Sequence, residues 1–189
     1  MSAPRSRAPL EKRARLRTAA ARHVAAHGLA GFNLHALAAE AGVGFDLARH
    51  YYRTNEALIA DVVRAYHVAL GERMADAVLA ARGLSGAARV EALALAALEA
   101  MVVERDGCLT ARAAMAALPR VAEAVRNWDA WLVGEFAEAL GDAVLARSLL
   151  MVVGEWATRV EGDEARGVCA RVVAGMGGGG NGIGLHSGW

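Results

Sequence analysis

Apolar residues recur at spacings of three and four along most of this chain, which is the period of an amphipathic α-helix. Near the N-terminus this spacing places Leu16, Ala20 and Val24 on one helix face. Alanine, the strongest helix former, supplies much of a hydrophobic content of 56%, and the chain contains only three prolines. Runs of Val, Ile, Thr or aromatic residues, which favour strands, are few. The pattern therefore predicts an all-α fold.

Glycines and capping residues divide this pattern into about nine helices. Asn33, Thr54 and Asp142 are residue types whose side-chain oxygens accept hydrogen bonds from the unpaired N–H groups at a helix start. Gly28 and Gly42 stand where glycine commonly ends a helix. The predicted helices cover residues 10–27, 34–41, 45–52, 55–81, 87–105, 110–117, 119–140, 143–160 and 164–176.

The two shortest predicted helices, residues 34–41 and 45–52, are joined by a tight turn. Leu34 and Leu37 give the first of them an apolar face, and Val43 is the apolar residue of the turn. Two helices joined at a steep angle by a short glycine-containing turn form a helix-turn-helix, which presents its second helix to the DNA major groove. This segment therefore predicts a DNA-binding unit.

The segment from Leu16 to about Tyr66 resembles the N-terminal domain of the TetR family of transcriptional regulators. The matching residues are Ala19-Ala20, Gly28 and Phe32 in and after the first helix, Leu37-Ala38 and Ala41-Gly42-Val43 at the turn, Tyr51-Tyr52 closing the recognition helix, and Glu56-Ala57-Leu58 opening the next helix. The resemblance implies an N-terminal three-helix DNA-binding domain and a C-terminal helical domain for ligand binding and dimerisation. Beyond Tyr66 only the general all-helical plan of the family is matched.

Three positions depart from the family pattern at the expected DNA contacts. Gly44 stands where the family usually has a Ser or Thr cap, and Arg49 replaces a commonly aromatic residue that contacts phosphate. Asn55 replaces a common Lys that anchors phosphate at the start of the fourth helix. The scaffold is therefore matched better than the set of DNA contacts.

Charge and composition divide the chain further. Residues 1–67 carry ten Lys/Arg against five Asp/Glu, a net +5, whereas the remainder carries eleven against fifteen, a net −4. A basic head on an acidic body suits a DNA-binding domain joined to a domain with another task. The predicted parts are a flexible basic arm at 1–9, the helix-turn-helix domain at 10–54, a helical regulatory and dimerisation domain at 55–176, and a disordered glycine-rich tail at 177–189.

The predicted recognition helix carries side chains that suit DNA contacts. Arg49 can read guanine through two hydrogen bonds, and His50 and Tyr51 can bond phosphate. Phe45 or Leu47 can meet a thymine methyl group. The predicted DNA-binding residues are Asn33, His35, Gly44, Phe45, Leu47, Arg49, His50, Tyr51 and Asn55. The alternative is that these side chains form an ordinary solvated helix face.

Aromatic residues and methionines gather in the predicted C-terminal domain, where Trp128, Trp131 and Trp156 fall in the seventh and eighth helices. With Arg105 to orient an acidic group, they predict a largely apolar pocket for a small apolar or aromatic effector. The predicted lining is Tyr66, Leu70, Met74, Met101, Arg105, Met115, Trp128, Trp131 and Trp156. Because such residues also form ordinary cores, plain packing stays the alternative for each of them.

The eighth and ninth predicted helices, about 143–176, carry more apolar residues than one core can cover. Leu149 and Met151 lie on different faces of the eighth helix, and Val168 and Val172 form a stripe on the ninth. The family resemblance implies that these helices pair with their copies in a homodimer. Two recognition helices would then enter successive major grooves roughly 34–36 Å apart, so that the DNA partner is an inverted-repeat operator.

Other classes of function find little support in the sequence. His23 and His27 share a helix face at a spacing that can seat a metal, but no third ligand accompanies them, so no metal or cofactor is predicted. Cys108 and Cys169 lie far apart, which suits a reducing cytoplasm. No combination of nucleophile and base indicates an enzyme. No apolar run approaches the length of a membrane span.

Together these features predict a cytoplasmic, sequence-specific DNA-binding transcriptional regulator, a repressor that a small apolar or aromatic ligand releases from its operator. The alternative is a helical small-molecule-binding or scaffold protein with a degenerate helix-turn-helix and no specific DNA binding. Gly44 and Asn55, which depart from the family pattern, motivate this alternative.

Overall fold

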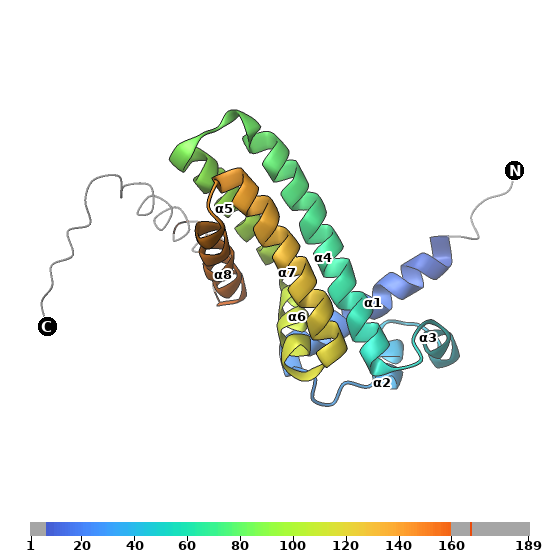
Figure 1. Ribbon diagram of the computed structural model, residues 1–189. Helices are drawn as coiled ribbons and strands as arrows, with labels where there is room; N and C mark the ends of the chain where they lie inside the picture. The colour runs from blue at the N-terminus through green and yellow to red at the C-terminus, as the bar shows by residue number, and fades with distance from the viewer. Residues whose placement is uncertain (1–6, 160–166, 168–189) are drawn as a thin grey trace, which may run out of the picture. The chain divides into compact units, whose positions relative to one another are not determined.

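The computed structural model describes residues 7–159 and Gly167, and every regular element in this part of the chain is helical. In chain order the elements are α1 (Arg7–His27), α2 (Leu34–Glu40), α3 (Phe45–Tyr51), α4 (Asn55–Ala80), the 3₁₀ helix η1 (Ala81–Gly83), α5 (Gly86–Val103), α6 (Arg105–Ala117), α7 (Pro119–Leu140) and α8 (Ala143–Arg159), as Figure 1 shows. The predicted all-α fold is confirmed. The predicted ninth helix and the glycine-rich tail lie outside the described residues.

Local hydrogen-bonding chemistry sets three helix starts, as the sequence predicts. Asn33 Oδ1 accepts from the His35 N–H at 2.9 Å before α2, and Thr54 Oγ1 accepts from the Ala57 N–H at 3.1 Å before α4. Asp142 Oδ1 accepts from two N–H groups in the first turn of α8, at 2.8 and 3.0 Å. Each cap satisfies backbone donors that have no partner within the helix.

The start of α1 differs from the prediction. The helix begins at Arg7, not at Leu10, so residues 7–9 of the predicted flexible arm are helical. Pro9 is compatible with this position because the N–H groups of a first helical turn have no intrahelical partner, and proline lacks only that N–H. The remaining residues of the predicted arm lie outside the described part of the chain.

The start of α6 at Arg105 corrects the predicted break at Asp106-Gly107, which lies inside the helix. Gly107 is buried against Tyr66 of α4, and a Cβ added to it would lie 2.7 Å from Tyr66 Cβ. Only glycine therefore permits this approach of α4 and α6. The gain from close packing outweighs the low helix propensity of glycine.

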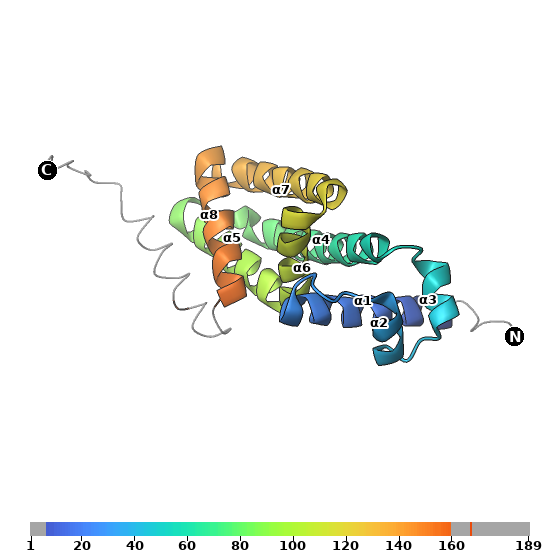
Figure 2. The same ribbon diagram turned by 90° about the horizontal axis from the view of Figure 1, so that it is seen from below.

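The chain forms two compact units. The first comprises Met1–Ala69 with Glu104–Ala130, and the second comprises Leu70–Val103 with Trp131–Trp189. In the first unit α1 packs against α6 and α2, and α2 packs against α3 (Figure 2). α4 and α7 each contribute residues to both units. The first unit thus contains α6 and part of α7 beside the helix-turn-helix, and the predicted domain boundary at residue 54 stays a prediction.

One apolar core holds the first three helices and the start of α4 together. Its buried members come from all four helices and from the turn between α2 and α3: Leu16, Ala19, Ala20, Ala21, Leu34, Leu37, Ala38, Val43, Ala48, Tyr52, Leu58 and Val62. Phe32 and Leu47 pack against the edge of this cluster. This shared, closely packed core holds α3 in a fixed position against the neighbouring helices.

The second unit is built around α5, which packs against α8. Leu93 and Leu98 of α5 are buried, as are Leu149 and Val153 of α8. No helix in the described ranges is both long and apolar enough to cross a membrane.

Candidate DNA-contacting surface and ligand groove

The turn between α2 and α3 is closed by a glycine in the left-handed conformation, with φ of +62° at Gly42. The Val43 N–H donates to the Ala38 carbonyl at 2.8 Å, and the Gly42 N–H donates to the Ala39 carbonyl at 3.1 Å. These two hydrogen bonds form a Schellman motif, a common way for a helix to end. Val43 is buried beneath the turn, so the predicted role of both residues is confirmed.

α3 is short and turns most of its side chains outward. Its one fully buried residue is Ala48, whose small side chain lets the helix lie close to the core. Phe45, Arg49 and His50 are exposed. Gly44 precedes the helix and provides no side-chain hydrogen bond to it, as its lack of a side chain dictates. The outward face of α3 therefore combines aromatic and basic side chains with one acidic side chain, Asp46.

The structure brings three of the predicted DNA-binding residues into contact. The ring centroids of His35 and Phe45 lie 4.9 Å apart, edge to face, and the guanidinium carbon of Arg49 lies 5.9 Å from the Phe45 centroid. We call this exposed group the His35–Phe45–Arg49 patch. It joins α2 to α3 and combines cationic and apolar groups of the kinds that meet phosphates, guanine edges and thymine methyls. His50 and Tyr51 follow on α3, with their rings 6.1 Å apart.

Three other predicted DNA-binding residues make contacts within the scaffold. Asn33 caps α2, and Leu47 packs against the apolar core. Asn55 Nδ2 donates to the Phe32 carbonyl at 3.0 Å, which ties the start of α4 to the loop after α1. These contacts give each residue a structural role, and a direct contact to DNA stays a prediction for them.

Solved structures have a similar fold, although no family model and no curated protein matches the sequence. A TetR-like transcriptional regulator from Rhodococcus sp. RHA1 superposes with a TM-score of 0.69 at 19% identity, covering 88% of this chain and 96% of that one. The chain has the TetR fold. The ketosteroid transcriptional regulator KstR2 of Mycobacterium tuberculosis gives a TM-score of 0.61 at 16% identity, with 88% and 93% of the two chains covered. The multidrug binding protein EbrR superposes with a TM-score of 0.59 at 25% identity, covering 85% of this chain and 94% of that one.

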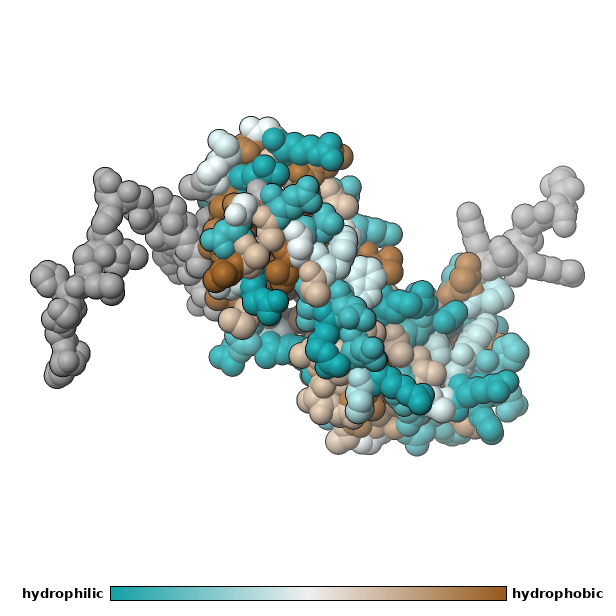
Figure 3. Space-filling model, viewed as in Figure 1, coloured by the Kyte–Doolittle hydropathy of each residue, from teal (hydrophilic) through white to brown (hydrophobic). Residues whose placement is uncertain are grey.

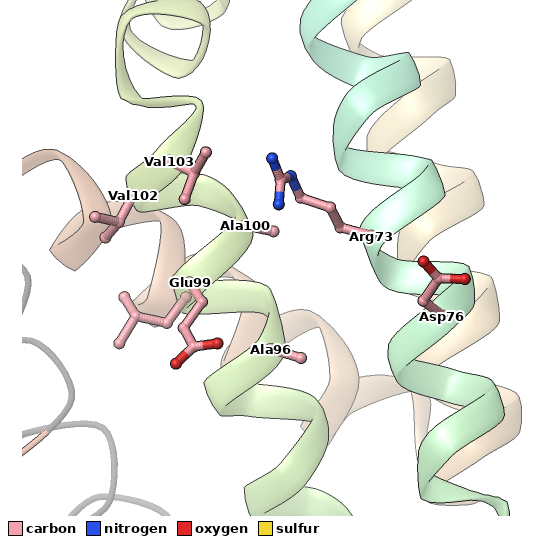
Figure 4. A pocket seen from close by; sticks show the side chains of 8 residues that line it. Arg73, Asp76, Ala96, Glu99, Ala100, Val102 and Val103 are labelled. Carbon is pink, nitrogen blue, oxygen red and sulfur yellow. The ribbon is translucent and has the colours of Figure 1, made fainter.

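Within the second unit, a groove of about 370 Å³ lies between α4 and α5. Figure 4 shows Arg73 extending from α4 toward α5, while Ala96 and Ala100 face α4. We call it the α4–α5 groove; its lining is Arg73, Asp76, Ala96, Leu98, Glu99, Ala100, Val102 and Val103. The groove thus combines apolar walls with three charged side chains, a composition that suits a small molecule with an apolar body and a polar group.

The residues predicted to line an apolar pocket do not line this groove and are divided between the two units. Tyr66, Arg105, Met115 and Trp128 belong to the first unit, whereas Leu70, Met74, Met101, Trp131 and Trp156 belong to the second. Leu70, Met74 and Met101 are buried, and Trp131 is 43% exposed. A role in ligand binding stays a prediction for these residues.

Within the first unit, Tyr66 is buried and Trp128 is half-buried. Trp128 stacks on the buried His67, with the planes 10° apart and the centroids 5.5 Å apart. His67 Nδ1 is 2.9 Å from the Val63 carbonyl, and burial lowers the pKa of this histidine. Burial likewise raises the pKa of the Cys108 thiol. These groups are therefore neutral at physiological pH and pack as core residues.

The sequence does contain a signal for the groove that the apolar-pocket prediction missed. Ala96 and Ala100 are four residues apart on α5, and so lie on one helix face. Small side chains at this spacing leave space beside the neighbouring helix. Arg73 and Asp76, three residues apart on α4, border that space.

No three His, Cys, Asp or Glu side chains in the described ranges are grouped closely enough to hold a metal ion. The rings of His23 and His27 lie 5.1 Å apart, and Phe32 meets His23 edge to face at 5.8 Å. This aromatic cluster packs the exit from α1 against the following loop.

Proposed function

We propose that this chain is a sequence-specific DNA-binding transcriptional regulator that acts as a dimeric repressor. The observation that carries the proposal is the exposed His35–Phe45–Arg49 patch on a rigid helix-turn-helix. The excess of Lys and Arg in residues 1–67 supports it, since positive charge attracts the DNA backbone. The TetR fold supports it as well, because two of the similar structures named above are transcriptional regulators.

Selection from random duplexes tests this function. At low salt and without ligand, the chain should enrich an inverted repeat whose half-sites lie about one helical turn apart, roughly 34–36 Å. A selection that returns no dyad-symmetric site would contradict the proposal. The selected duplex, called the operator below, then serves as the probe for every variant.

A second candidate function is a helical small-molecule-binding or scaffold protein with a degenerate helix-turn-helix. Two observations favour this candidate. Asn55 donates a hydrogen bond to the Phe32 carbonyl, and Gly44 provides no side-chain cap for α3. Salt dependence separates the two functions. Specific binding through several phosphates weakens steeply with salt and retains a large ratio of operator to random affinity. Weak binding without such a ratio would favour the scaffold.

We propose that the homodimer forms through α8 together with the segment that follows it, up to about residue 176. Two large apolar side chains of α8 are exposed in the single chain, Val144 at 76% and Met151 at 70%. Apolar side chains appear in brown over α8 in Figure 3. Burial of such a face against a second copy would stabilise association.

We propose further that the α4–α5 groove binds the effector that releases the repressor from DNA. The apolar lining, including Leu98 and Val102, supports an apolar or aromatic body. Arg73, Asp76 and Glu99 support a polar or charged group on the same molecule. Because α4 contributes both to this groove and to the first unit, a ligand that favours one conformation of α4 could alter DNA binding.

A further inference from the structure

A buried carboxylate in α4 connects α1, α4 and the residue that ends α3. Asp61 is 5% exposed, and its Oδ2 accepts from Tyr52 Oη at 2.5 Å and from Arg13 Nε at 3.0 Å. Arg17 Nη1 lies 3.6 Å from the same oxygen, and Arg64 donates to Oδ1. We call these five side chains the Asp61 network. None of them is among the residues that the sequence singles out for DNA binding.

Tyr52 is the link between this network and the recognition helix. It ends α3, and its N–H donates to the Ala48 carbonyl at 2.8 Å. Its ring is 2% exposed within the apolar core, while its hydroxyl donates to Asp61. Burial, reinforced by the nearby carboxylate, raises the pKa of Tyr52 to about 12, so the hydroxyl remains a donor at neutral pH.

The charges of the network do not cancel. Three guanidinium groups surround a single carboxylate, which leaves a local charge of +2. The side chains of Arg13, Arg17 and Arg64 are 40%, 31% and 60% exposed, so much of this charge reaches solvent on the unit that contains α3. Exposed positive charge strengthens binding to any DNA phosphate, whatever the base sequence.

We propose that Asp61 is a positioning residue that sets the sequence specificity of DNA binding without contacting DNA. It sets specificity by fixing the end of α3 through Tyr52. Separately, it lowers the affinity for every duplex alike by cancelling one of three positive charges. The inference rests on the proposed DNA-binding function. Recognition of the base sequence depends on the position of α3, whereas affinity for any duplex depends on positive charge. Asp61 affects both properties.

Three variants test this role. Asp61→Asn keeps the size of the side chain and removes its charge, and Tyr52→Phe removes only the hydroxyl that donates to Asp61. Glu11→Gln, on an exposed position of α1, is the matched control because it also adds one unit of positive charge. Fluorescence anisotropy would measure affinity for the operator and for a scrambled duplex of the same length and composition.

The expected result is a change in the ratio of the two affinities. Asp61→Asn should bind the scrambled duplex at least as tightly as the parent but lose about tenfold in the ratio, the factor that one charge-assisted hydrogen bond can supply. Tyr52→Phe should lower the ratio without strengthening scrambled binding. Glu11→Gln should keep the ratio of the parent.

Equal changes in both affinities, or an unchanged ratio in both Asp61→Asn and Tyr52→Phe, would overturn the inference. Far-ultraviolet circular dichroism and thermal unfolding identify a variant that fails to fold. If Asp61→Asn does so, Tyr52→Phe decides the outcome, because it retains the packed ring. A parent that binds both duplexes equally would refute the proposed function itself, which distinguishes that failure from a failure of the inference.

Discussion

Among single residues of α3, Arg49 has the most direct chemistry for reading DNA. Its side chain is exposed, and the Phe45 ring beside it limits the directions in which the guanidinium can point. Arg49→Ala should weaken operator binding by about 1–3 kcal/mol, the range for a lost bidentate base contact. Tyr51→Phe, which removes one hydroxyl, should weaken it less. Anisotropy titrations with the operator measure both effects.

The matched control for Arg49→Ala is Arg82→Ala in η1, which removes the same charge from an exposed position in the second unit. The control should change operator affinity little. If Arg49→Ala and Tyr51→Phe both bind like the parent, α3 does not read the operator through these side chains.

The Asp61 carboxyl should also control stability in acid. Burial alone would raise its pKa, but hydrogen bonds from Tyr52 and Arg64 and the charges of Arg13 and Arg17 outweigh burial, so the pKa is lowered. A carboxyl with a lowered pKa stabilises the folded state at neutral pH, and this contribution disappears as the pH falls through the folded-state pKa.

Urea unfolding of the parent and Asp61→Asn at several pH values checks this expectation. The parent should be more stable at neutral pH, and the difference in unfolding free energy should shrink as the pH falls below the ordinary carboxyl pKa of 3.8. A difference that stays constant over this range would show that the charge of Asp61 contributes no net stability.

Sequence predicts the residues of the site whose contacts are local, and misses those whose contacts are distant. Asn33 and Gly42 act on backbone groups within a few residues, so their roles follow from residue type and position. Tyr52 and Asp61 are nine residues apart and Arg13 is far from both, so only the packing of α1 against α4 brings them together. No periodic pattern signals such a network.

At the scale of helices, the distinction between local and distant contacts explains why the helix break predicted at Asp106-Gly107 is wrong. The bounds of α7, Pro119–Leu140, agree with the prediction because proline and the glycine after Leu140 mark its two ends locally. The start of α6 depends instead on the contact between Gly107 and Tyr66, which lies outside the reach of local propensity. Helix ends set by tertiary contacts are therefore the ones that a sequence pattern leaves undetermined.

Two helical glycines provide a matched test of this packing. Gly107→Ala would place a Cβ 2.7 Å from Tyr66 Cβ, so it should destabilise the fold by about 1–3 kcal/mol through overpacking. Gly134→Ala in α7 meets nothing within 4 Å and should instead stabilise by about 0.5–1 kcal/mol, because alanine favours helix over glycine.

Urea unfolding monitored by circular dichroism measures both changes. Opposite signs for the two substitutions are the expected result. A stabilising effect of Gly107→Ala would mean that α4 and α6 can separate at little cost, and would contradict a close approach of the two helices at Gly107.

At the scale of the whole molecule, the exposed face of α8 determines the proposed association. Met151→Glu introduces a charge into a face that the dimer would bury, which should shift sedimentation at micromolar concentration from dimer toward monomer. Leu79→Glu is the control, because Leu79 is 57% exposed on α4, away from α8 in the chain. A monomeric parent, or a Met151→Glu variant that remains dimeric, would exclude this face as the interface.

Ligand and operator should be thermodynamically coupled if the α4–α5 groove binds the effector. Small molecules with an apolar body and a polar group can be screened by quenching of tryptophan fluorescence. Ala96→Leu would fill the groove and should weaken ligand binding while leaving operator affinity in the absence of ligand unchanged. Ala75→Leu, at an exposed position of α4 outside the groove lining, is the matched control and should bind ligand like the parent.

Reciprocity then supplies the decisive measurement. A ligand shifts the equilibrium between two states only by its differential affinity for them, so operator must change ligand affinity by the same factor by which ligand changes operator affinity. Titrations of the ligand with and without saturating operator should therefore differ by about 5–150-fold, the usual range of such coupling. Identical affinities in the two titrations would leave the groove as a binding site and refute its role in releasing the repressor.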